Sequence, residues 1–133
     1  SELVKKVKEL QREDPSRYDA CSARLAELSA RFASAFCSGN APGVVAEAAE
    51  YCAAMKALGD AAGAPILEAR LERAGELAAR FSGSAKPCGA GGGDVAVAFF
   101  VEPSAAKGFE LACSDEGLHP IDVSWGASGV QAY

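Results

Sequence analysis

The sequence predicts an α+β fold in which N-terminal helices pack on a small antiparallel sheet. Up to residue 81, apolar side chains recur at intervals of three and four, which is the spacing of one face of a helix. From Ser82 onward glycines become frequent, charges become sparse, and short runs of β-branched and aromatic residues follow. Helices followed by a strand-rich region are typical of the α+β class. The 133 residues, half of them hydrophobic, suffice for one domain with a single core.

The first two helices are expected to meet at a proline. A short amphipathic helix carries Leu3, Val7 and Leu10, and it ends at Asp14 because the residue before a proline disfavours helical geometry. A long helix then begins near Pro15. Its predicted apolar face consists of Tyr18, Cys21, Leu25, Leu28, Phe32 and Phe36.

Two further helices follow a turn at residues 38–40. Asn40 is expected to cap the third helix, with Pro42 in its first turn. Residues 59–65, rich in glycine and alanine, should separate the third helix from the fourth. The apolar positions of the third are Val44, Ala48, Cys52, Met55 and Leu58, and those of the fourth are Leu67, Leu71, Ala74, Ala78 and Phe81.

The remaining chain, residues 82–133, is expected to form the sheet and one helix. Residues 84–88 predict a short strand, and the uninterrupted apolar run 95–101 predicts a buried one. Ser104 should cap a helix that Gly117 closes. Residues 121–125 and 130–133 alternate as strands do.

Charge and cysteine usage exclude several classes of function. Thirteen Lys and Arg against eighteen Asp and Glu give a net charge of −5, which argues against a nucleic-acid or anionic-membrane partner. No apolar run approaches the roughly 18 residues of a membrane span, and no signal segment opens the chain, so a cytoplasmic location is expected. Five dispersed cysteines and a single histidine, His119, make a zinc site or a disulfide framework unfavourable.

The beginning of the chain indicates a processed or excised piece. It starts at Ser1, and its only methionine is Met55. We therefore expect part of the working protein to lie outside these residues.

The most unusual local feature is the glycine-rich run at residues 89–94. Glycines allow positive φ and let backbone N–H groups approach an oxygen-rich ligand, although a hairpin loop can be glycine-rich for conformational reasons alone. No Lys-Ser or Lys-Thr follows, as a Walker A loop requires. The glycines also precede a strand and open no helix, which disfavours a dinucleotide-binding fingerprint.

In its context this run resembles the third conserved motif of the GHMP kinases, which phosphorylate galactose, homoserine, mevalonate and phosphomevalonate. The matching segment is SAKPCGAGGGD at residues 84–94, followed by the predicted strand. GAPI at 63–66, GLHPIDV at 117–123 and GASGV at 126–130 look like the phosphomevalonate kinases of bacteria. A departure is Val95, where those kinases often carry Cys.

The resemblance implies a two-domain kinase of which residues 1–133 form the C-terminal, ferredoxin-like domain. ATP and Mg²⁺ would then be bound by the missing N-terminal kinase domain, along with the groups usually assigned to catalysis. This chain alone would bind no cofactor, contain no catalytic residue and be inactive. Its partners would be that domain and a small phosphorylated acceptor.

The resemblance also implies roles for the residues of the run. Backbone amides of the loop would orient the transferring phosphates, and Gly92→Val should harm turnover far more than folding. Asp94 either holds the loop through backbone bonds, which we favour, or faces a substrate hydroxyl. Lys86 either neutralises a substrate phosphate or is a solvated surface lysine. The loop residues are Gly89, Ala90, Gly91, Gly92, Gly93 and Asp94.

Neighbouring residues leave alternatives open. Cys88 is either a thiol in an open cleft or, as we prefer, a small buried filler. His119 is expected in a loop or at a strand edge, and Arg80 could approach the glycine run from a helix end. The function itself has two alternatives: a GHMP kinase acting on mevalonate or another small alcohol or sugar, and a non-catalytic domain that binds a metabolite or a protein.

Overall fold

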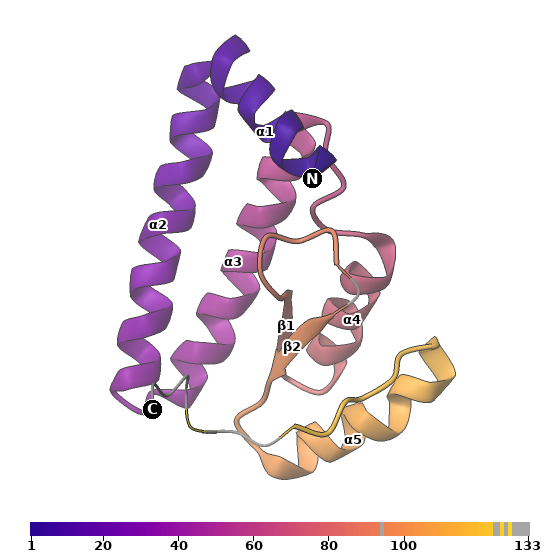
Figure 1. Cartoon of the computed structure of the whole chain (residues 1–133). Helices are drawn as coiled ribbons and strands as arrows, with labels where there is room; N and C mark the ends of the chain where they lie inside the picture. Colours follow the sequence, from indigo (N-terminus) through magenta and orange to yellow (C-terminus); the bar gives the residue numbers. More distant parts are fainter. Residues whose placement is uncertain (94, 124–125, 127, 129–133) are drawn as a thin grey trace, which may run out of the picture.

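Five α-helices and a two-stranded antiparallel sheet make up the described part of the chain, in agreement with the α+β prediction (Figure 1). The computed structural model describes residues 1–93, 95–123, 126 and 128. Its elements are α1 (Glu2–Glu13), α2 (Pro15–Cys37), α3 (Ala41–Ala62), α4 (Ala69–Arg80), β1 (Ser84–Pro87), β2 (Ala96–Phe99), α5 (Pro103–Cys113) and the 3-10 helix η1 (Ser114–Glu116).

The predicted corner between α1 and α2 is confirmed. The backbone N–H of Asp14 donates to Leu10 O at 2.8 Å and ends α1. The Asp14 carboxylate accepts from the N–H of Arg17 at 3.0 Å and caps α2, whose first residue is Pro15. One aspartate thus satisfies backbone groups of both helices.

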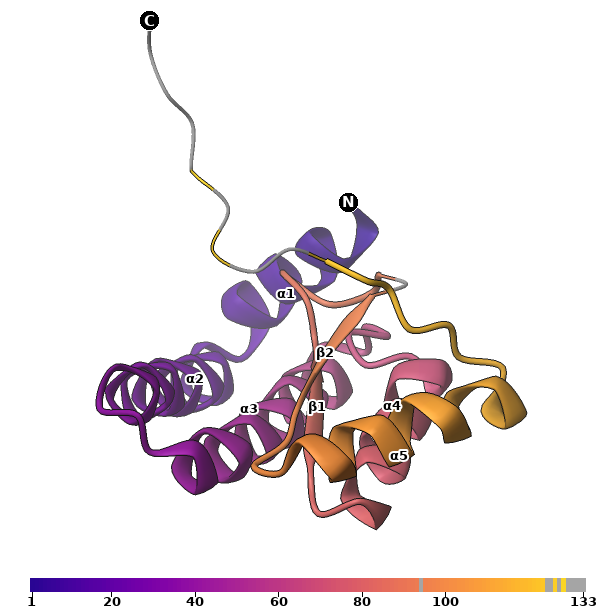
Figure 2. The ribbon, with the colours of Figure 1, turned by 90° about the horizontal axis from the view of Figure 1, so that it is seen from below.

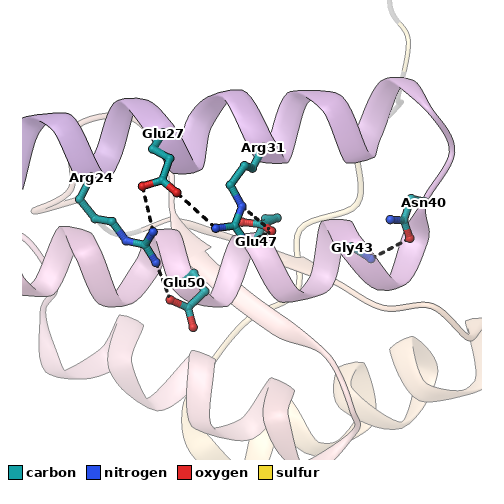
Figure 3. Close-up of polar contacts among 7 residues, drawn as sticks. All are labelled: Arg24, Glu27, Arg31, Asn40, Gly43, Glu47 and Glu50. Atoms are coloured by element: carbon teal, nitrogen blue, oxygen red, sulfur yellow. Dashed lines mark hydrogen bonds and ion pairs between the residues drawn. The ribbon is translucent and has the colours of Figure 1, made fainter.

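The α2–α3 hairpin is also confirmed, with the predicted cap at its turn. Asn40 Oδ1 accepts from the N–H of Gly43 at 3.0 Å (Figure 3). Leu28 and Ala48 are fully buried, as their places on the two apolar faces predict. Phe36 is 64% exposed, because it lies at the end of α2 beside the turn, where it stacks on Phe32.

The boundary between α3 and α4 differs from the prediction at both ends. α3 continues through Gly59 to Ala62, and Gly63 ends it in the left-handed conformation with φ 60°. A Cβ on Gly59 would lie 2.7 Å from Ala64 O, so this glycine serves the close approach of the following loop. Ile66 does not open α4, which begins at Ala69, because Ile66 is buried in a core cluster with Met55 and Ala64.

The sheet lies against the helices mainly through β1. Ser84 pairs with Phe99 and Pro87 with Ala96, so the glycine-rich run connects the two strands. β1 is mostly buried, since α3 and α4 both contact it (Figure 2). The prediction of a buried second strand is wrong: β2 is half-buried throughout, because those helices contact β2 less extensively than they contact β1.

The last described helix packs on α4. Gly108 of α5 faces the ring of Phe81, where an added Cβ would lie 2.7 Å from Cε1. Ser104 is not the cap, because the helix starts one residue earlier at Pro103, after Glu102. Gly117 was expected to close this helix, but α5 ends at Cys113 and Gly117, with φ 68°, closes the following 3-10 helix η1.

Of the two predicted C-terminal strands, only residues 121–123 lie in the described part of the chain. Residues 121–123 form no strand, and Ile121 is 67% exposed, so the apolar alternation there finds no sheet edge. Ser124 and Trp125, which complete that prediction, and residues 130–133 lie outside the described part of the chain.

Candidate functional site

The loop that joins β1 to β2, which we call the glycine loop, comprises residues 88–93 of the described chain. At its base the N–H of Cys88 donates to Val95 O at 3.0 Å. Gly89, Gly91 and Gly92 have φ of 63°, 81° and 63°, a region that side chains disfavour. Asp94, the remaining residue of the predicted site, lies outside the described residues.

Two glycines, Gly91 and Gly92, form the packed half of the loop. A Cβ on Gly91 would lie 2.5 Å from both Cγ2 and the carbonyl oxygen of Ile66. The N–H of Gly92 donates to Ile66 O at 2.8 Å, and a Cβ on Gly92 would overlap Leu3 Cδ1. These two positions therefore require glycine for packing within the chain, whether or not a ligand binds.

The exposed half consists of Gly89, Ala90 and Gly93. All three are exposed, and a Cβ on Gly89 or Gly93 would meet nothing within 4 Å. At Gly89 and Gly93 an anion can approach the backbone without displacing any side chain of the described residues. Successive backbone N–H groups in turn conformations can form concave sites for anions, and Gly89 and Ala90 are successive exposed residues of this turn.

Gly92→Val is therefore a poor test of function. Its side chain would collide with Leu3, and its φ of 63° would strain any residue other than glycine. The prediction that it harms turnover far more than folding is therefore replaced: the substitution should reduce stability as well as any activity. Substitutions at Gly89 and Gly93 test the function of the loop more directly, because a Cβ there meets nothing within 4 Å.

Lys86 is half-buried on β1 rather than freely solvated. Its Nζ donates to Pro87 O at 3.1 Å and lies 5.3 Å from the ring centroid of Tyr51 on α3. That is the geometry of a cation–π contact, which would fix the ammonium group beside the loop. Tyr51 was missed at the sequence level, because no local signal links a residue of α3 to a lysine of β1.

The surroundings of Lys86 are electrostatically mixed. Burial raises the pKa of the Cys52 thiol, the Glu72 carboxylate raises it further, and the Lys86 ammonium lowers it. Glu72 also pairs with Lys56 at 3.5 Å. The Cys52 thiol therefore stays protonated at neutral pH, which does not suit a nucleophile.

The other residues singled out from the sequence lie apart from the loop or differ from expectation. Cys88 is exposed, so its interpretation as a buried filler is wrong: the strand ends at Pro87 and the chain turns outward. Arg80 contacts Glu116 at 3.5 Å instead of the glycine loop. His119 is exposed in the loop after Gly117, as predicted.

A bidentate ion pair joins α4 to η1. Arg73 Nε and Nη2 donate to the two carboxylate oxygens of Glu116 at 2.6 and 2.7 Å. These hydrogen bonds from Arg73 are the main cause of the lowered pKa of Glu116. The pair holds the end of α5 in place and lies outside the glycine loop.

A cluster of paired charges lies on the α2–α3 hairpin (Figure 3). Arg24 bridges Glu27 and Glu50, and Arg31 bridges Glu27 and Glu47. Each arginine contacts two carboxylates, so the cluster is a mutually paired surface network. Within the described residues no group of three or more His, Cys, Asp or Glu side chains is placed to hold a metal ion.

Comparison with known proteins supports the fold alone. No family model and no curated protein matches the chain. The structure of a Lin0012 protein from Listeria innocua matches with a TM-score of 0.78 at 24% sequence identity. The two share a fold. The match covers 86% of this chain but 31% of the other, so the chain spans about a third of that protein's length.

In the part of the chain that the structure describes, none of the helices is both long and apolar enough to cross a membrane.

Proposed function

We propose that this chain is the C-terminal domain of a cytoplasmic GHMP-type kinase that phosphorylates phosphomevalonate with ATP, giving ADP and diphosphomevalonate. The observation that carries the proposal is the exposed half of the glycine loop. Its backbone is open to solvent at Gly89, Ala90 and Gly93, while Gly91 and Gly92 are fixed against Ile66 and Leu3. A firmly held loop with open amides suits the binding of a phosphate group.

Two further observations support this proposal. The sequence of the loop and its flanking strand resembles the third motif of these kinases. The structural match also spans most of this chain but about a third of a longer protein, as expected of one domain within a larger enzyme.

The chemistry that this chain contributes would be positioning. Phosphoryl transfer depends mainly on alignment of donor and acceptor and on stabilisation of the charge on the phosphoryl oxygens. The amides of the exposed half would orient the acceptor phosphate, and Lys86, fixed by Tyr51, would supply a nearby positive charge. ATP with Mg²⁺, bound by the N-terminal domain, would supply the transferred phosphoryl group.

A second candidate has one observation in its favour. Gly91 and Gly92 are explained by contacts within the chain, so half of the loop needs no ligand to account for its glycines. That suits a non-catalytic domain that binds a metabolite or a protein. A kinase acting on mevalonate or another small alcohol or sugar is the corresponding alternative for the acceptor.

A matched pair of glycine substitutions tests the proposal in the natural gene product that contains this chain. Gly89 and Gly39 have φ of 63° and 69°, and a Cβ on either meets nothing within 4 Å. Replacement by alanine should therefore cost about 1–2 kcal/mol of stability at each position. Gly39 lies in the α2–α3 turn, away from the glycine loop.

The assay measures ADP release with phosphomevalonate, mevalonate and galactose as acceptors. We expect turnover with phosphomevalonate, reduced about tenfold or more by Gly89→Ala relative to Gly39→Ala, because the methyl group displaces the bound phosphate. Equal activity of the two variants would contradict the role of the loop. Absence of ADP release with every acceptor would favour the non-catalytic candidate.

A further inference from the structure

Helix α1 lies near the glycine loop and the α3–α4 loop that contacts it (Figures 1 and 2). Leu3 and Val7 pack on the core cluster that includes Ile66 of the α3–α4 loop. Lys6 Nζ donates to Gly63 O at 2.8 Å, at the C-terminal end of α3. One side of α1 is thus attached to the segment that in turn contacts the glycine loop.

Leu3 completes the enclosure of Gly92. The N–H of Gly92 is bonded to Ile66 O at 2.8 Å, and Leu3 Cδ1 occupies the space where a side chain of residue 92 would lie. The packed half of the loop is therefore held between two residues that are distant in sequence. Neither residue belongs to the loop or to its two strands.

The attachment of α1 is limited in extent. Leu10 is its one buried residue, whereas Leu3 and Val7 are half-buried and Val4 is 46% exposed. An interface of this size can open locally at lower cost than unfolding the α2–α3 hairpin, whose contacts include the fully buried Leu28. The N-terminal part of α1 can thus affect the order of the glycine loop at a lower cost than unfolding the hairpin.

We propose that Leu3 is a positioning residue for the glycine loop. Its contact with Gly92 would hold the exposed half of the loop in the conformation that binds the phosphate of the acceptor. This inference rests on the proposed function for its effect on turnover, but the Leu3 contact itself can be tested separately. A loop ordered before binding loses less conformational entropy when the ligand arrives, which improves affinity.

The test compares Leu3→Ala with Val4→Ala in the natural gene product. Both variants shorten an apolar side chain in the first turn of α1, but Val4 is exposed. Hydrogen–deuterium exchange is followed in peptides from the glycine loop and, as an internal reference, in peptides from the α2–α3 hairpin. Leu3→Met, which keeps an apolar side chain of similar size, is the rescuing variant.

We expect Leu3→Ala to accelerate exchange of the Gly92 amide, the loop amide that is bonded to Ile66 O, about tenfold, which is the order expected for loss of a half-buried leucine contact. The hairpin peptides, Val4→Ala and Leu3→Met should remain within about twofold of the unmodified protein, since none loses the Gly92 contact. In the kinase assay, Leu3→Ala should raise KM for the phosphorylated acceptor more than it lowers kcat.

Unchanged loop exchange in Leu3→Ala would overturn the inference, and so would equal acceleration in Val4→Ala. Equal acceleration in the hairpin peptides would also overturn it, because Leu3 would then support the whole fold rather than the loop. Faster loop exchange in a protein that phosphorylates none of the acceptors would uphold the Leu3 contact and refute the proposed kinase function. Failure of the Leu3 inference and failure of the proposed kinase function thus give different results.

Discussion

The α2–α3 hairpin and the glycine loop are held by different kinds of contact. The hairpin turn is fixed locally, since the Asn40 side chain caps α3 by accepting from the N–H of Gly43, which follows it by three residues. The glycine loop is fixed from outside, by Leu3 of α1 and Ile66 of the α3–α4 loop. A local turn can be recognised from neighbouring residues, whereas a loop held by distant residues cannot.

Truncation of the hairpin core should have the largest effect on stability. Leu28 is fully buried, so Leu28→Ala leaves a cavity and should lower the free energy of unfolding by about 2–5 kcal/mol. Phe36→Ala, at the 64% exposed end of the same face, should cost under about 1 kcal/mol. Urea denaturation measures both values. Similar losses would mean that the hairpin core extends to its turn.

Substitution in the packed half of the glycine loop should have an intermediate effect. Gly91 has φ 81° and would place a Cβ 2.5 Å from Ile66 O, so Gly91→Val should cost about 1–3 kcal/mol through strain and overlap. Gly93→Val, where the added Cβ meets nothing within 4 Å, is the control and should cost under about 0.5 kcal/mol. Thermal unfolding compares the two. Equal stability would refute the division of the loop into a packed and an exposed half.

The surface ion pairs of the hairpin should have the smallest effect. Hydrogen bonds from Arg24 are the main cause of the lowered pKa of Glu27. A carboxylate whose pKa is lower in the folded state stabilises the fold above its unfolded pKa and loses that contribution as pH falls through the folded value. As pH falls below about 4.5, the free energy of unfolding should therefore decline less in Glu27→Gln than in the unmodified protein. The difference between the two proteins should be small, as is typical of exposed ion pairs. Urea denaturation as a function of pH provides the measurement, and parallel curves would contradict the assignment.

Local rules predicted most of the helical part. The Asp14–Pro15 corner, the Asn40 cap and the buried positions Leu28 and Ala48 follow from capping preferences and from the spacing of apolar residues. The same rules failed at Gly59, which was expected to end α3. It lies within the helix because the chain folds back on it at Ala64.

The strand predictions were less successful, for a related reason. The apolar run at residues 95–101 predicted a buried strand, yet β2 is half-buried because α3 and α4 lie mainly against β1. The alternation at residues 121–123 predicted a strand where the structure has none. A strand needs a neighbouring edge and a covered face, and both are supplied by residues elsewhere in the chain.

By itself, the sequence determined the α+β class, the helices and the position of the glycine-rich run, because helix periodicity, caps and glycine content act over a few residues. Only the tertiary structure decided that Gly91 and Gly92 are packed against Ile66 and Leu3 while Gly89 and Gly93 face solvent. The four glycines are chemically identical. They differ in whether a residue distant in sequence lies against them, as Ile66 and Leu3 do at Gly91 and Gly92. Only folding brings those distant residues to the loop.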